Sequence, residues 1–276
     1  NRSQPPYLEL DIIDRHIDTA VKIRIRARPA AKTSRPRSTR FWYWSLRALA
    51  RPILNARMEI DALGLGNIPS SGPAILVSNH RSGQDPQVIS SIVPRYIAWV
   101  AANYMGRVPI QGPILRRLGV VFVSTLSGGG AAQFFEQAKK VLSAGELLGV
   151  FPEGEEYIFA NDFSAPPSRF HTGFAALALR NDTPIVPLAI HPVKESLKPI
   201  PIPTVARREL KRRYDLSNVR RMPQYQAVRV IFGKPIRPSA IDITADDLAE
   251  RVRDKVVGLL RSCASGESLS SSEPSK

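Results

Sequence analysis

The segment LVSNHRSGQDPQVI, residues 76–89, places an imidazole and a carboxylate five residues apart. An apolar run ends at Ser78 and Asn79, His80 follows at once, and Asp85 comes five positions later. A neutral imidazole, with a pKa of about 6.5, is suited to remove a proton near neutral pH. A carboxylate bonded to its other ring nitrogen would fix the tautomer and stabilise the imidazolium as it forms.

The same residues also fit a purely structural role. Asp85 followed by Pro86 is typical of a helix start, with Asp at the N-cap and Pro at the first helical position. His80 would then be a loop histidine whose polar atoms are satisfied. If the pair is chemical, it acts on a substrate hydroxyl, because the sequence contains no strand–GxSxG–helix elbow that would supply an enzyme nucleophile.

Neither a metal nor a nucleic acid is an expected partner. Near His80 the only second ligand type is Asp85, and Cys263 is the single cysteine, so neither a cysteine-based zinc site nor a disulfide framework is expected. The net charge of +15 favours anionic partners such as membrane surfaces. Zinc-finger spacing and the interleaved aromatics of RNA-binding domains are absent from the sequence. The remaining histidines lack ligand spacing: His16, His171 and His191.

Three motifs in order resemble those of the 1-acylglycerol-3-phosphate acyltransferase family, the glycerolipid acyltransferases. Residues 79–85 match the pattern NHxxxxD, residues 151–154 match FPEG, and residues 184–190 match a hydrophobic strand with Val-Pro. Order and spacing agree over roughly residues 57–235. The matched positions are Asn79, His80, Asp85, Phe151, Pro152, Glu153, Gly154, Val186 and Pro187.

This resemblance implies an O-acyltransferase of phospholipid biosynthesis that needs no resident cofactor. His80 is the implied general base on a hydroxyl of a lyso-lipid, and Asp85 orients it. The oxygen attacks the thioester carbonyl of a co-substrate, acyl-CoA or acyl carrier protein. Pro152, Glu153 and Gly154 are implied to help bind the lyso-lipid acceptor.

The chain departs from the family pattern at three positions predicted to contact the acceptor. Thr125 stands where the second motif usually ends in arginine, and Glu155 and Glu156 replace the Thr-Arg that usually follows FPEG. In the family, the basic residues hold the acceptor's phosphate. Acidic side chains would repel that phosphate and favour a phosphate-free acceptor, such as an aminoacyl lipid or a glycolipid. Alternatively, the phosphate contact has moved to glycines 128–130, or the chain is an inactive membrane-binding module.

Positioning these residues requires an α/β domain, expected over residues 57–263. Helical patterns at 131–145, at 170–181 and from Thr244 onward fall among apolar, β-branched runs. Such alternation is typical of a single domain with a mostly parallel mixed sheet flanked by helices. The runs that predict strands are MEIDAL, AILVS, YIAWVA, GVVFVS, LLGVF, PIVPLAI and AVRVIF.

The flanking segments indicate contact with a membrane surface. Residues 1–40 contain four prolines and many basic residues, which predicts a mobile basic arm attracted to anionic lipids. Residues 41–56 mix aromatics, aliphatics and arginines, which is typical of an amphipathic helix in a membrane interface, although packing on its own domain is the alternative. Residues 264–276 form a polar tail expected to be disordered. Because no run approaches 18 apolar residues, we expect a peripheral or monotopic membrane protein on the cytoplasmic face.

Overall fold

A computed structural model of the chain provides the structure. It describes residues 37–123, 130–154, 163, 165–199, 221–240 and 242–265, which all lie in one compact unit, Ala31–Lys276. Several predictions fall outside these residues: those for the basic arm up to residue 36, the tail from residue 266, glycines 128 and 129, Thr125, Glu155 and Glu156.

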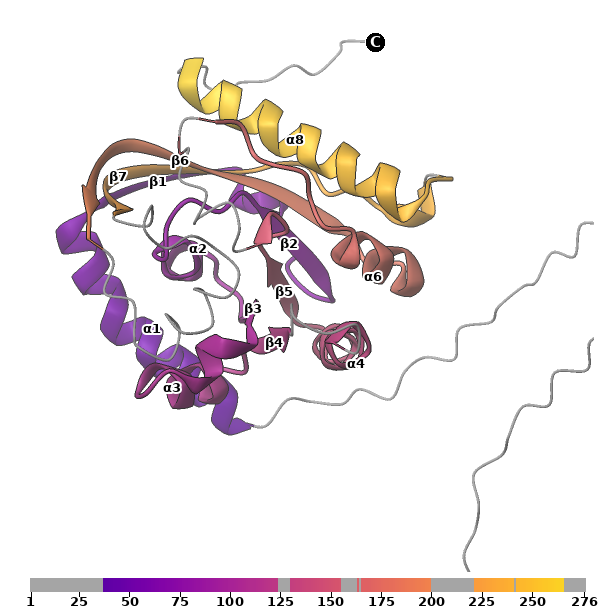
Figure 1. Cartoon of the computed structure of the whole chain (residues 1–276), viewed down its shortest axis with the longest axis horizontal. Helices are drawn as coiled ribbons and strands as arrows, with labels where there is room; N and C mark the ends of the chain where they lie inside the picture. Colours follow the sequence, from indigo (N-terminus) through magenta and orange to yellow (C-terminus); the bar gives the residue numbers. More distant parts are fainter. Residues whose placement is uncertain are drawn as a thin grey trace, which may run out of the picture. The chain divides into compact units, whose positions relative to one another are not determined.

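The seven predicted strands form one sheet with the order β1-β7-β6-β2-β5-β3-β4 (Figure 1). Neighbouring strands run parallel except β6 and β7, which are antiparallel. The predicted α/β fold with a mostly parallel sheet is confirmed. The strands are β1 Glu59–Leu63, β2 Ala74–Ser78, β3 Ile97–Ala102, β4 Val121–Val123, β5 Leu147–Val150, β6 Ile185–Lys198 and β7 Met222–Phe232.

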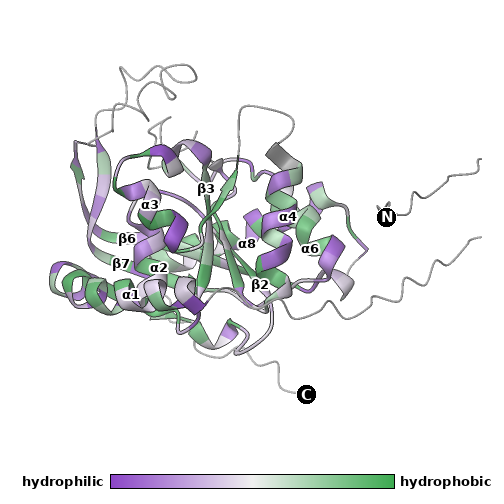
Figure 2. Cartoon of the chain, turned by 90° about the horizontal axis from the view of Figure 1, so that it is seen from below, coloured by the Kyte–Doolittle hydropathy of each residue, from purple (hydrophilic) through white to green (hydrophobic). Residues whose placement is uncertain are grey.

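Helices cover both faces of the sheet (Figure 2). Side chains alternate between the two faces of a strand, so Ile75 and Val77 of β2 pack in the cluster with α4, α6 and α8, whereas Ala74 and Leu76 pack in the cluster with α2. The helices are α1 Arg37–Arg57, α2 Asp85–Ile92, α3 Gln111–Arg117, α4 Gly130–Ser143, α6 Gly173–Asn181 and α8 Ala245–Ser265, with 3-10 turns η1 Leu65–Asn67, η2 Asn103–Arg107 and η4 Pro238–Ala240.

Helix α1 contains the amphipathic helix expected at residues 41–56, but begins four residues earlier. Its Arg47 guanidinium donates to the carbonyls of Ser90 and Ser91 at 2.7 and 2.9 Å, which ties α1 to α2. Tyr43 is buried, whereas most other large apolar side chains of α1 are exposed. In the described part of the chain, no helix combines the length and the hydropathy needed to cross a bilayer.

Strands β6 and β7 extend well beyond the apolar runs that predicted them. Residues 191–198 pair with residues 222–229 in an antiparallel two-stranded segment, here called the β6–β7 ribbon. The ribbon contains a register shift near Pro192 and Lys194. Its main chains satisfy one another's hydrogen bonds, so its side chains need not be apolar. Hydrophobic patterning therefore revealed only the part of each strand inside the sheet.

Gly149 lets the edge of the sheet pack tightly beside the residues that follow β5. A Cβ at this position would lie 2.5 Å from Trp99 Cζ3 and 2.9 Å from Ile97 Cγ2, closer than real Cβ atoms approach. The Trp99 indole, on the neighbouring strand β3, therefore lies directly over the Gly149 backbone. Two residues later, Phe151 stacks on the same indole, with ring centroids 4.9 Å apart.

Replacing Gly149 by alanine should destabilise the protein by about 1–3 kcal/mol, because Trp99 and Ile97 must move to admit the methyl group. For a chain of this size that corresponds to a fall in melting temperature of several degrees, measured by circular dichroism. Gly66→Ala is the matched control, since a Cβ there has no atom within 4 Å. Equal melting temperatures for the two variants would contradict this account of the packing.

Candidate active site

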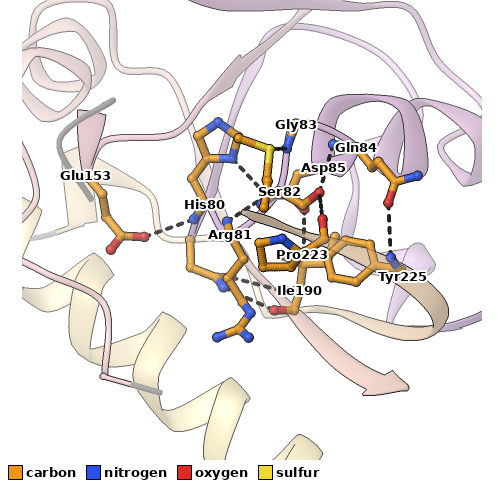
Figure 3. Close-up of polar contacts among 12 residues, drawn as sticks. His80, Arg81, Ser82, Gly83, Gln84, Asp85, Glu153, Ile190, Pro223 and Tyr225 are labelled. Carbon is orange, nitrogen blue, oxygen red and sulfur yellow. Dashed lines mark hydrogen bonds and ion pairs between the residues drawn. The ribbon is translucent and has the colours of Figure 1, made fainter. Parts of the chain in front are cut away.

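The predicted site residues follow two adjacent parallel strands at the same edge of the sheet. His80 comes after β2, and Glu153 comes after β5, which pairs with β2. The side chain of Asn79 continues the contact between β2 and β6. Its Nδ2 donates to the Ile190 carbonyl at 3.0 Å, and its Oδ1 accepts from the Ile190 N–H at 2.9 Å. The structure thus brings His80, Asp85 and Glu153 together, as Figure 3 shows.

His80 and Asp85 form the pair that the sequence predicted. His80 Nδ1 lies 2.7 Å from Asp85 Oδ2. The imidazole is 17% exposed and the carboxylate is fully buried. Oδ2 also accepts from the main-chain N–H groups of Arg81 and Ser82, at 2.8 and 2.9 Å. Because a carboxylate only accepts hydrogen bonds, a neutral imidazole in this position carries its proton on Nδ1 and leaves Nε2 as the basic nitrogen.

The expected helix start is present, but Asp85 is not its N-cap. Helix α2 begins at Asp85, Gln84 occupies the N-cap position, and the Gln84 side chain makes no capping hydrogen bond. Pro86 is the second residue of the helix, one position later than expected. The capping prediction is therefore wrong in detail: the Asp85 carboxylate turns back to bind amides of the preceding loop, because those donors and His80 surround it.

An aromatic stack covers one face of the His80 imidazole. The rings of His80 and Phe151 are stacked with centroids 4.1 Å apart and an interplanar angle of 18°. Phe151 stacks in turn on Trp99, whose indole N–H donates to Ser90 Oγ at 2.9 Å. From the sequence, Phe151 was assigned only a match to the FPEG motif. The stack restricts rotation of the His80 ring and shields that face from water.

Glu153 links the His80 loop to a second loop. Its Oε1 accepts from the His80 N–H at 2.9 Å, and its Oε2 accepts from the Ser168 N–H at 2.9 Å. The Ser168 carbonyl in turn accepts from Arg253 of α8 at 2.9 Å. Burial raises the pKa of Glu153, although the two amide hydrogen bonds and His80 oppose that shift. A role of Glu153 in binding the acceptor stays a prediction.

Pro152 and Gly154 shape the turn on either side of Glu153. Pro152 is buried, and its carbonyl accepts from the His171 N–H at 2.9 Å. Gly154 has a φ of 74°, in the left-handed region that disfavours other residues. A Cβ there would also approach His171 Nε2 to 3.3 Å.

Among the residues with described positions, no group of three His, Cys, Asp or Glu side chains could hold a metal ion.

Two polar side chains of the site were missed by sequence reasoning. Arg81 forms an ion pair with Glu195 of β6 at 2.8 Å and donates to the Phe163 carbonyl. The Tyr225 hydroxyl, from β7, donates to Asp85 Oδ1 at 2.7 Å. Tyr225 lies 140 residues after Asp85 in the chain. No local pattern could have connected them, because the contact exists only once β7 pairs with β6.

Comparison with known proteins supports the resemblance that the motifs suggested. Residues 59–191 match the family model described as Acyltransferase. The chain is 28% identical over 136 residues to a 1-acyl-sn-glycerol-3-phosphate acyltransferase of Borreliella burgdorferi, covering 49% of this chain and 52% of that protein. It is 25% identical over 176 residues to a probable enzyme of the same name from Mycoplasma pneumoniae, covering 62% and 59%.

The fold is also that of a solved acyltransferase structure. The crystal structure of the 1-acyl-sn-glycerophosphate (LPA) acyltransferase PlsC from Thermotoga maritima superimposes with a TM-score of 0.56. The match covers 86% of this chain and 81% of that one, at 18% sequence identity. The chain spans between half and three fifths of the length of the two curated relatives above.

The raised pKa of Glu153 predicts a pH-dependent stability difference between the wild type and Glu153→Gln. The folded state holds the Glu153 proton more tightly than the unfolded state, so ionisation of this carboxyl costs stability. The wild type should therefore lose stability relative to the variant as pH rises from about 4, near the unfolded pKa, through the raised folded pKa. Urea unfolding of both proteins across this range measures the difference.

A difference that instead grows in favour of the wild type with rising pH would contradict this expectation. It would mean that the two amide hydrogen bonds to Glu153 outweigh the cost of burying its charge.

Proposed function

We propose that this chain, whose residues 59–191 match the acyltransferase family model, transfers a fatty acyl group from a thioester to a hydroxyl of a lyso-lipid. The observation that carries the proposal is the 2.7 Å contact between His80 Nδ1 and the buried Asp85 carboxylate, at the carboxyl edge of β2. This contact leaves His80 Nε2 as the base for an incoming hydroxyl.

In the proposed reaction, His80 Nε2 takes the proton of the acceptor hydroxyl as its oxygen attacks the thioester carbonyl. The new C–O bond forms, the C–S bond breaks, and the thiolate leaves. The imidazolium then protonates the thiolate, which releases a free thiol of CoA or of acyl carrier protein. General-base catalysis of this kind contributes about 10²–10⁴-fold to the rate. Asp85 stabilises the transient imidazolium, and neither a metal nor a resident cofactor is required.

The leading acceptor is a 1-acylglycerol 3-phosphate, because the two curated relatives carry the name of enzymes acting on that substrate class. The second candidate is a phosphate-free lyso-lipid. It is favoured by Glu155 and Glu156, which follow the FPEG motif where family members usually have Thr-Arg. Carboxylates this close in sequence to Glu153 would repel a phosphate monoester and attract an amine headgroup.

We further propose that α1 docks the protein on a membrane surface. The spacing of Trp42, Leu46, Leu49 and Ile53 places them on one side of the helix, and all four are exposed. Ile110, which precedes the neighbouring helix α3, is also exposed, at 80%. Exposed apolar side chains combined with a net charge of +15 suit a surface of anionic lipid.

The central test is His80→Ala with release of free thiol from oleoyl-CoA as the readout. We expect turnover to fall at least about 100-fold, because the general base is lost. A panel of lyso-lipids with and without a phosphate monoester identifies the acceptor in the wild type. The variant should stay folded but melt about a few degrees below the wild type, because it loses the ring that stacks on Phe151 and one hydrogen bond to the buried Asp85 carboxylate. Activity within a few-fold of the wild type would rule out His80 as the base.

Membrane docking is tested with the double variant Leu49→Ser, Ile53→Ser, whose side chains are 66% and 49% exposed. Loss of this apolar area should weaken co-sedimentation with vesicles of anionic phospholipid roughly tenfold or more. The matched control is Val193→Ser, Leu197→Ser on β6, where the side chains are 61% and 48% exposed. An equal loss in both double variants would mean that α1 has no special part in docking.

A further inference from the structure

The β6–β7 ribbon contacts every residue of the loop between the base and its carboxylate. Arg81 pairs with Glu195. The next contacts follow in order along the loop: Ser82 Oγ donates to the Pro223 carbonyl at 2.7 Å, the Gly83 N–H points at Met222 Sδ at 3.1 Å, and Gln84 Oε1 accepts from the Tyr225 N–H at 3.0 Å. Asp85 completes the series through the Tyr225 hydroxyl (Figure 3).

Tyr225 supplies the hydrogen bond that the other groups around Asp85 cannot. His80 and the two loop amides all bind Oδ2, whereas Tyr225 binds Oδ1. Burial, and then the adjacent Asp85 carboxylate, raise the pKa of Tyr225 well above its ordinary value of 10.0. The hydroxyl therefore remains a proton donor throughout the neutral range, and Asp85 remains its acceptor.

We infer that Tyr225 is a positioning residue for acyl transfer, acting on His80 through Asp85 from the β6–β7 ribbon. This inference rests on the proposed function and goes beyond it by assigning a residue of β7, outside the motifs and outside residues 59–191, to the same reaction. The hydroxyl disperses part of the carboxylate's charge and fixes the plane of the carboxylate. Both effects determine how strongly, and in which direction, Asp85 binds His80 Nδ1.

Loss of the hydroxyl has a consequence of definite sign. With one donor fewer, the charge of an ionised Asp85 is more concentrated at His80 and favours the imidazolium. Less neutral imidazole is then present at a given pH, so the acid limb of the pH–rate profile and the imidazole titration both move to higher pH. The other charged groups around the pair are the same in wild type and variant: Glu153, Arg81 and Glu195.

The test compares Tyr225→Phe with Tyr96→Phe. The Tyr96→Phe variant also loses a tyrosine hydroxyl, which in the wild type donates to the Leu118 carbonyl at 2.8 Å. Tyr96 directly precedes β3, at the end of that strand opposite to the edge that carries His80 and Asp85. In Tyr225→Phe the acid limb of the pH–rate profile should move up by about 1 pH unit, the equivalent of a tenfold change in proton affinity. Turnover below neutral pH should fall about tenfold and recover at higher pH.

An activity-free readout separates this inference from the proposed function. The NMR titration of the His80 imidazole, assigned by its absence in His80→Ala, should move to higher pH in Tyr225→Phe and stay unchanged in Tyr96→Phe. If the wild type acylates no acceptor, the proposed function fails, and the titration still tests Tyr225. A titration curve that superimposes on the wild type, or a loss of turnover that is equal at every pH, would overturn the positioning role.

A second variant decides the matter if Tyr225→Phe does not fold. Gln84→Met keeps the Tyr225 hydroxyl but removes the side-chain acceptor of the Tyr225 N–H. Its acid limb and its imidazole titration should shift in the same direction by a smaller amount. An unshifted titration in this folded variant would count against the inference.

Discussion

The arrangement of the site depends on the hydrogen bonds that the fully buried Asp85 carboxylate accepts. A carboxylate out of contact with water is costly unless its lone pairs accept hydrogen bonds. Here the main-chain N–H groups of Arg81 and Ser82, the His80 ring and the Tyr225 hydroxyl all donate to it. The loop must curl around Asp85 to bring its amides within reach. That same curl carries the His80 ring to the carboxylate, so one electrostatic requirement sets the shape of the whole segment.

The order of strands in the sheet makes this solution possible. β2 lies between β6 and β5, so the loop after β2 has neighbours on both sides. On the β5 side, Glu153 binds the His80 main chain and Phe151 stacks on the His80 ring. On the β6 side, the antiparallel partner β7 brings Tyr225 to Asp85. A doubly wound sheet usually binds its ligand at the carboxyl edge of its parallel strands, and the His80–Asp85 pair lies at that edge.

The buried surroundings of His80 and the exposed side of α1 carry different kinds of side chain. Around His80, polar groups are buried and paired, and the aromatic stack with Phe151 excludes water from one face of the ring. On α1, large apolar side chains are exposed, and Arg47 anchors the helix to α2 through main-chain carbonyls. The proposed reaction on a lipid acceptor that stays partly in the bilayer would use both: a fixed base, and an apolar surface that brings the base to the interface.

The sequence by itself determined the seven strands, the α/β class and the His80–Asp85 pair, because hydrophobic periodicity and a short motif are local properties. It also located the start of α2, although it assigned Asp85 a capping role that the carboxylate does not fill. Only the tertiary structure decided what holds Asp85 and His80 in place. Tyr225 lies 140 positions from Asp85 along the chain. Phe151 and Glu153 lie 71 and 73 positions from His80. Such contacts arise from strand order and burial, which no local pattern encodes.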